Sequence, residues 1–83
     1  MTTIAPNKSI ILGKVRAVRG DLVDIHVAAT RPAWPGVADL AAEHTGAVLT
    51  VRAPQNDLAP DQDVELSVTL GPGPDGLTPE FAV

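Results

Sequence analysis

Residues 10–27, IILGKVRAVRGDLVDIHV, carry the strongest signal for a fold class in this sequence. Its second half alternates, with Val23, Ile25 and Val27 separated by polar residues, as in a half-buried β-strand. Its first half opens on three consecutive apolar residues, which predicts a strand buried on both faces. Gly20 lies between the halves and can supply the positive φ of a tight turn. We therefore expect an antiparallel hairpin, to which further strands must add for stability in water.

Three further strands are expected from alternating or apolar runs bounded by turn residues. They are Ala47–Ala53, Val64–Leu70 and Leu77–Val83. A bulge is expected near Ala17-Val18, where the alternation of the first strand breaks. Five short strands with turn signals between them are typical of a small closed barrel. The predicted fold is all-β, a small five-stranded OB-like or SH3-like barrel with one short helix.

The segment between the second and third strands is expected to leave the sheet. Residues 28–36 contain two prolines, which disrupt ladder pairing. Trp34 lies between these prolines, and we interpret it either as a lid on one end of the barrel or as an exposed anchor for a protein partner. Residues 37–44 are expected to form the short helix, because Leu40 and His44 fall on one apolar stripe.

Length and composition set the domain organisation. The 83 residues suffice for one domain, expected at 9–83 after a flexible arm at 1–8. There are no cysteines, which suits a reducing compartment. No apolar run is long enough to span a membrane, and the first residues lack the pattern of a signal peptide. We therefore expect a cytoplasmic protein.

The charge of −4 is distributed unevenly along the chain. Residues 1–20 hold four basic side chains and no acidic one, whereas all ten acidic residues follow. A basic first strand can attract a small anion or an acidic partner, although a solvated strand face explains it as well. The candidate ligand-binding residues are Lys8, Ser9, Lys14, Arg16 and Arg19.

Two stretches resemble a known family. Residues 7–27 open with Asn, an apolar run, Gly-x-Val, a spacer and Gly, and residues 49–68 give a strand, a Leu-x-Pro turn and another strand. Both are similar to the transport-associated OB (TOBE) domain that ends many ABC-transporter ATPases and to the small molybdate-binding Mop proteins. The resemblance covers about half the chain and implies an OB-like barrel that assembles into oligomers. It also implies an oxyanion site, of which Asn7, Lys8 and Ser9 match a part. Asp61 stands where the family usually has Gly, and residues 28–46 look like an insertion.

The sequence indicates neither a metal site nor a catalytic set. His26 and His44 lack the spacing of a metal pair, and no third ligand is evident. No arrangement of nucleophile and base or of paired carboxylates is indicated. We therefore expect no enzyme activity, no metal and no cofactor.

These observations favour a non-catalytic binding or regulatory module that engages a protein partner, its own copies or a small anion. The alternatives are an OB protein that binds single-stranded nucleic acid and an accessory subunit of a larger enzyme complex. Two aromatic residues and a negative net charge weigh against nucleic acid. Because Pro79 interrupts the closing strand, we expect an unpaired edge there and a homo-oligomer, most simply a dimer.

Overall fold

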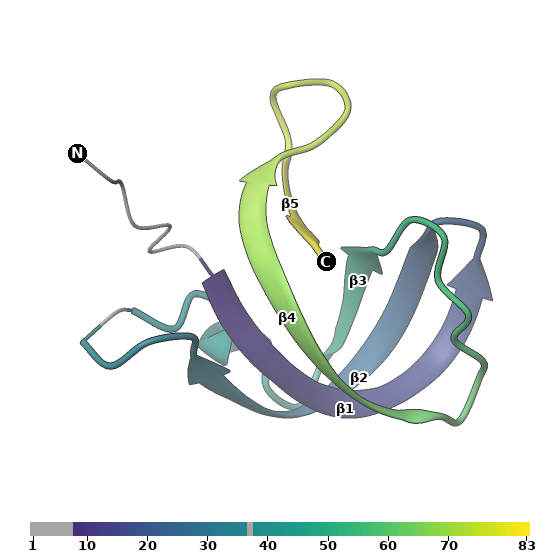
Figure 1. Ribbon diagram of the computed structural model, residues 1–83, viewed down its shortest axis with the longest axis horizontal. Coiled ribbons are helices and arrows are strands. Elements are labelled where there is room, and N and C mark those ends of the chain that lie inside the picture. The colour runs from purple at the N-terminus through teal and green to yellow at the C-terminus, as the bar shows by residue number, and fades with distance from the viewer. Residues whose placement is uncertain (1–7, 37) are drawn as a thin grey trace.

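The hairpin expected around Gly20 forms the longest part of the sheet (Figure 1). In a computed structural model that describes residues 8–36 and 38–83, β1 (Lys8–Arg19) pairs antiparallel with β2 (Leu22–Pro32). A two-residue turn joins them, with Gly20 at a φ of 63°. Lys8 therefore belongs to the first strand, and the remainder of the expected arm, residues 1–7, lies outside the described residues.

The rest of the chain closes this hairpin into a barrel. The following elements are the 3-10 helix η1 (Ala42–His44), β3 (Val48–Arg52), β4 (Asp63–Pro72) and β5 (Pro79–Ala82). The strands are ordered β1-β2-β3-β5-β4, and β4 returns to β1. The β3–β5 pair is parallel and the other pairs are antiparallel. The expectation of an all-β, five-stranded barrel with one short helix is confirmed.

The unpaired edge expected at the closing strand is wrong. β5 pairs with β4 on one side and with β3 on the other, so the barrel is closed. Pro79 is tolerated because it is the first residue of β5, opposite Pro72 at the end of β4. The unpaired edge is therefore lost as a reason for self-association, and the oligomeric state stays a prediction that rests on the resemblance to the TOBE and Mop families.

Residues 28–36 depart from the expectation in part. β2 continues to Pro32, which is opposite Ser9, because a proline at the last position of a strand disrupts little of the ladder. The expected helix is also shorter. Among the described residues of 37–44, Ala42–His44 form one 3-10 turn, consistent with the marginal stability of so short a helix.

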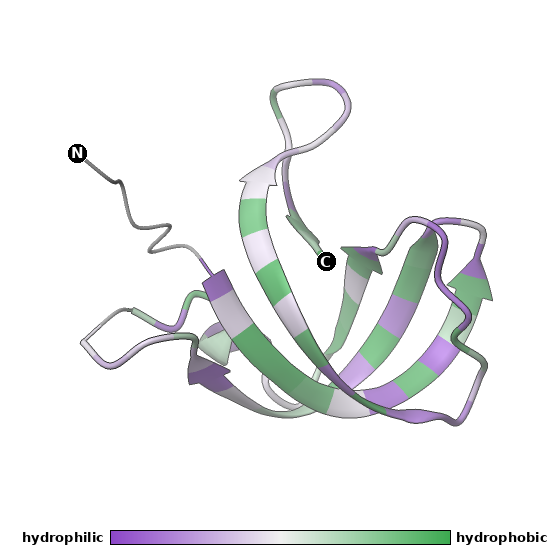
Figure 2. Cartoon of the chain, viewed as in Figure 1, coloured by the Kyte–Doolittle hydropathy of each residue, from purple (hydrophilic) through white to green (hydrophobic). Residues whose placement is uncertain are grey.

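The expectation that β1 is buried on both faces is wrong. Ile11 is fully buried, whereas Ile10 and Leu12 are only half-buried, so burial alternates along this part of β1 although these three residues are all apolar (Figure 2). The β1–β2 register shifts between Val15 and Ala17, close to the bulge expected at Ala17-Val18. Such shifts increase the local twist that curls a sheet into a barrel.

The barrel interior is filled mainly by aliphatic side chains. The buried hydrophobic residues are Ile11, Val15, Val23, Ile25, Val27, Ala41, Leu49, Val51, Ala53, Val68 and Phe81. Trp34 is 41% exposed, so the interpretation of this residue as a lid is wrong. From the segment between β2 and β3, Ala41 joins the core instead.

Candidate functional site

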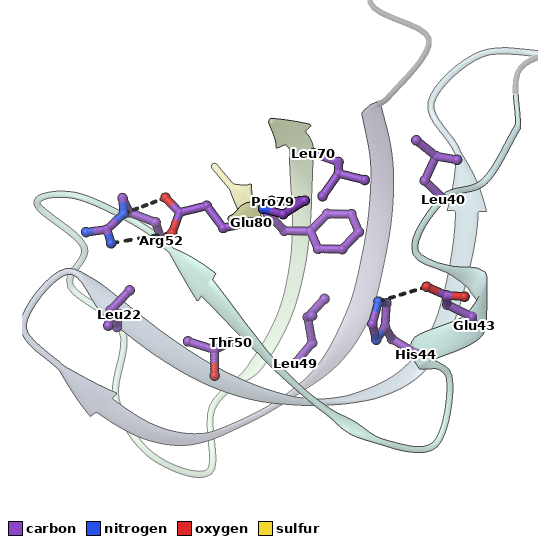
Figure 3. Close-up of a pocket in the computed structure, with 11 residues that line it drawn as sticks. Leu22, Leu40, Glu43, His44, Leu49, Thr50, Arg52, Leu70, Pro79 and Glu80 are labelled. Carbon is purple, nitrogen blue, oxygen red and sulfur yellow. Dashed lines mark hydrogen bonds and ion pairs between the residues drawn. The ribbon is translucent and has the colours of Figure 1, made fainter. Parts of the chain in front are cut away.

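A cavity of about 580 Å³ opens along β3, β5 and η1, and we call it the seam cleft (Figure 3). β3 and β5 are paired only at Val51–Phe81 and Arg52–Ala82 in their register. The cleft is lined by Leu22, Leu40, Glu43, His44, Leu49, Thr50, Arg52, Leu70, Pro79, Glu80 and Phe81. The shortest pairing in the barrel thus adjoins this cavity.

One end of the seam cleft is built by the segment around η1. The His44 ring meets Phe81 edge to face, with ring centroids 5.5 Å apart and an interplanar angle of 86°. Leu40 is 36% exposed and lines the same end (Figure 3). The Glu43 carboxylate lies 3.6 Å from His44 Nε2. This end therefore presents an apolar wall with one titratable pair beside it.

The other end of the seam cleft is polar. Arg52 Nε donates to Glu80 Oε1 at 2.7 Å, and Arg52 Nη2 approaches Glu80 Oε2 at 3.4 Å. The Glu80 carboxylate raises the pKa of the Arg52 guanidinium. This fork is a charge-assisted contact that joins β3 to β5 where the two strands are paired.

Next to the cleft, Asp24 ties β2 to β3. Its Oδ1 accepts hydrogen bonds from Thr50 Oγ1 and Arg19 Nη2, both at 2.7 Å. The bond from Thr50, and then that from Arg19, holds the pKa of the Asp24 carboxyl below its ordinary value. Arg19 is thereby committed to an ion pair.

The main chain of β3 also contributes to the site. Ala53 N donates to Asp21 O and Ala47 O accepts from Val27 N, so the odd-numbered residues direct their main-chain groups toward β2. Arg52 O accepts from Val83 N, so the even-numbered residues face β5. The main-chain N–H and C=O groups of Val48 therefore face the side of β5. In the described β3–β5 register, no residue of β5 lies opposite Val48.

The basic residues expected to bind a ligand do not converge. Lys8 and Arg19 lie at opposite ends of the twelve-residue β1. Ser9 is fully buried, and its Oγ has no hydrogen-bond partner in the described part of the chain. Lys14 and Arg16 do come together, at a second cavity of about 460 Å³.

Trp34 is exposed in the loop after β2 and lines neither cavity described above. The sequence alone does not mark Leu40, Phe81 or the Arg52–Glu80 pair as site residues. The helical spacing of Leu40 and His44 did place them on one side, which is a partial signal. The pairing of β3 with β5 has no comparable signal in the sequence, because it joins segments that are distant along the chain.

Among residues 8–36 and 38–83, no group of three His, Cys, Asp or Glu side chains is placed to hold a metal ion. Within the same residues, no helix has the length and apolar character needed to cross a membrane. Comparisons of the chain with protein-family models, curated proteins and solved structures gave no match.

Proposed function

We propose that this protein is a non-catalytic binding module of the OB type, which engages an extended segment of a protein partner through the seam cleft. The strand order β1-β2-β3-β5-β4 with a parallel β3–β5 pair supports the OB type over the SH3-like alternative. It also supports the resemblance to TOBE and Mop barrels. A cytoplasmic location is part of the proposal, since a chain without cysteines suits a reducing compartment.

The observation that carries the proposal is the short seam between β3 and β5. An extended segment can pair with an unoccupied strand position while its alternate side chains enter pockets beside that strand. Val48 offers such a position, and the apolar side chains of Leu40, Leu49 and Phe81 offer the pocket. The cavity of about 580 Å³ is within the usual range for ligand pockets, about 300–1,000 Å³.

Single-stranded nucleic acid is a weaker candidate for this surface. Nucleic-acid-binding OB proteins stack bases on exposed aromatic rings in a basic groove. Phe81 is 5% exposed, which leaves Trp34, away from the cleft, as the other aromatic residue. In the described part of the chain, four of the six basic side chains already pair with carboxylates. An accessory role in a larger complex agrees with the proposal, because the partner segment can belong to an enzyme.

Site-specific cross-linking tests the proposal. A photo-reactive amino acid is placed at Leu40, which lines the seam cleft, and in a control at Leu77, which is 86% exposed and does not line it. We expect a discrete protein adduct from position 40 in cells that express the protein, and none from position 77. Cross-linking from position 77 alone, or equally from both, would contradict the assignment of the cleft as the binding site.

The same experiment addresses self-association. If the partner segment belongs to a second copy, the adduct from position 40 has twice the 8.6 kDa mass of the chain. Sedimentation at micromolar concentration then shows a dimer as well. An adduct of another mass together with sedimentation near 8.6 kDa assigns the cleft to a different protein.

A further inference from the structure

The second cavity, of about 460 Å³, lies at the middle of β1 and shares no lining residue with the seam cleft. We call it the bulge pocket, because two irregularities of the β1–β2 register border it. At the register shift between Leu12 and Gly13, Ala28 of β2 has no opposite residue in β1. At the shift between Val15 and Ala17, Arg16 of β1 has no opposite residue in β2. The pocket is lined by Leu12, Gly13, Lys14, Arg16, His26, Ala28, Asp63 and Val64. Bulges commonly redirect side chains at binding sites, and here one of them presents Arg16 to the pocket.

Of the two basic side chains that line the bulge pocket, Arg16 has no ion-pair partner among the described residues. It is exposed, whereas Arg19, Arg31 and Arg52 each form an ion pair with a carboxylate. Lys14 is held loosely, since its Nζ lies 3.7 Å from Asp63 Oδ1 and both side chains are largely exposed. Such exposed pairs contribute little energy and exchange partners readily. Two positive charges are thus available against one negative charge.

Apart from the exposed His26, the remainder of the bulge pocket is apolar. Leu12, Ala28 and Val64 come from three adjacent strands, β1, β2 and β4, and Gly13 adds bare main chain between them. A strongly hydrated anion such as phosphate gains nothing from these side chains. A ligand with an apolar body and one anionic head satisfies both parts of the pocket.

We propose that the bulge pocket binds a small carboxylic acid with an aliphatic or aromatic body. The carboxylate lies against the Arg16 guanidinium, whose planar fork suits two parallel hydrogen bonds, and Lys14 adds a second charge. The apolar body covers Leu12, Ala28 and Val64. This site is independent of the seam cleft, so either proposal can fail without the other.

Titration with octanoate tests the ligand class, with octanamide and inorganic phosphate as matched probes. Backbone amide NMR is recorded on the intact protein at low salt. We expect saturable shifts at Gly13, His26, Ala28 and Val64 with octanoate, and binding about ten-fold weaker with octanamide and with phosphate. Equal binding of octanoate and octanamide, or no saturation with octanoate at about 10 mM, would overturn the proposal.

Three variants test the assigned residues. Arg16→Gln should weaken octanoate binding about ten-fold, since it keeps a polar side chain but removes the charge. Asp63→Asn should tighten binding, because it releases Lys14 and removes a competing carboxylate. Arg31→Gln is the control, since Arg31 pairs with Glu65 and does not line the pocket. Amide spectra of each variant confirm folding. The proposal is wrong if Arg16→Gln and Arg31→Gln have the same effect, or if Asp63→Asn weakens binding.

Discussion

The main chain of Gly13 in β1 packs directly against the carbonyl group of His26 in β2. A Cβ built on Gly13 would overlap that carbonyl oxygen and also crowd the Ile25 side chain. The contact lies where the β1–β2 register shifts, between Leu12 and Gly13. Glycine here permits a close approach of two strands. The same approach borders the bulge pocket.

Gly13→Ala is therefore expected to destabilise the barrel by about 3 kcal/mol, at the upper end of the cost of overpacking, because main chain must move. Gly71→Ala in β4 is the matched control. An added Cβ at Gly71 meets nothing within 4 Å, so this change should be neutral or stabilise by up to about 1 kcal/mol. Chemical denaturation measures both. Equal stability of the two variants would show that the close approach is absent in solution.

The hairpin could be predicted from the sequence because its signals are local. Alternation placed Val23, Ile25 and Val27 on one face, and all three are fully buried. The pairing of β5 could not be predicted in this way, because its β3 partner lies about thirty residues away and is parallel. Pro79 indicated an edge strand, yet a proline at the first position of a strand disrupts little of the ladder.

The candidate sites were predictable to a smaller degree. The basic character of β1 was evident, but its length and curl separate Lys8 and Arg19 from Lys14 and Arg16. Ion pairs across strands cannot be read from one sequence, so the commitment of Arg19 to Asp24 was not foreseen. The expected bulge lies next to Arg16, which has no opposite residue in the β1–β2 register. The absence of an ion pair at Arg16 among the described residues could not be predicted from the sequence.

Asp61 stands where the TOBE and Mop families usually have glycine, and its backbone has a positive φ. Asp61 has a φ of 70°, and Gln55 earlier in the same connection has a φ of 57°. A left-handed conformation costs a residue with a Cβ roughly 1–2 kcal/mol, and less for Asp than for most others. Asp61 thus keeps the left-handed backbone conformation that glycine favours.

Gln55→Gly is therefore expected to raise the free energy of unfolding by about 0.5–1 kcal/mol, after allowance for the greater freedom of glycine in the unfolded chain. Asp61→Gly should give a smaller gain. Ala59→Gly is the control. Because Ala59 does not have a positive φ, the Ala59→Gly variant should lose about 0.5–1 kcal/mol of unfolding free energy. Urea midpoints at unchanged slope measure all three. A loss of stability in Gln55→Gly would contradict the strain argument.

A measurement of folding stability can test whether the Ser9 hydroxyl is simply buried in the barrel. Its side chain is fully buried, and its hydroxyl is unpartnered among the described residues. A buried hydroxyl without a partner costs about 1–3 kcal/mol, so Ser9→Ala should stabilise the barrel by about 1 kcal/mol. Ser67→Ala, at an exposed position of β4, should change stability by less than about 0.5 kcal/mol. A destabilised Ser9→Ala would mean that the hydroxyl is hydrogen-bonded in solution.

The Asp75 carboxylate makes three hydrogen bonds within the loop between β4 and β5, in addition to main-chain bonds from Gly73 N to Thr78 O and from Gly76 N to Gly73 O. Asp75 Oδ1 accepts from the main-chain N–H groups of Leu77 and Thr78, both at 2.9 Å, and Asp75 Oδ2 accepts from Thr78 Oγ1 at 2.7 Å. The bond from the Thr78 main chain, then that from Leu77, and then the Thr78 hydroxyl lower the pKa of the Asp75 carboxyl to about 2. This loop projects from the barrel and leads into β5, the strand that closes the barrel (Figure 1). A fixed loop conformation therefore helps to position β5.

Because the folded-state pKa of Asp75 lies below the unfolded value of about 3.9, its contribution to stability is complete above about pH 4 and is lost as the pH falls through about 2. Asp75→Asn should therefore be less stable than wild type at neutral pH, and the two unfolding midpoints should converge as the pH approaches 2. Titration of the Asp75 carboxyl carbon by NMR provides the direct measurement. A pKa near 4, or a stability difference that does not change with pH, would show that these hydrogen bonds do not persist in solution.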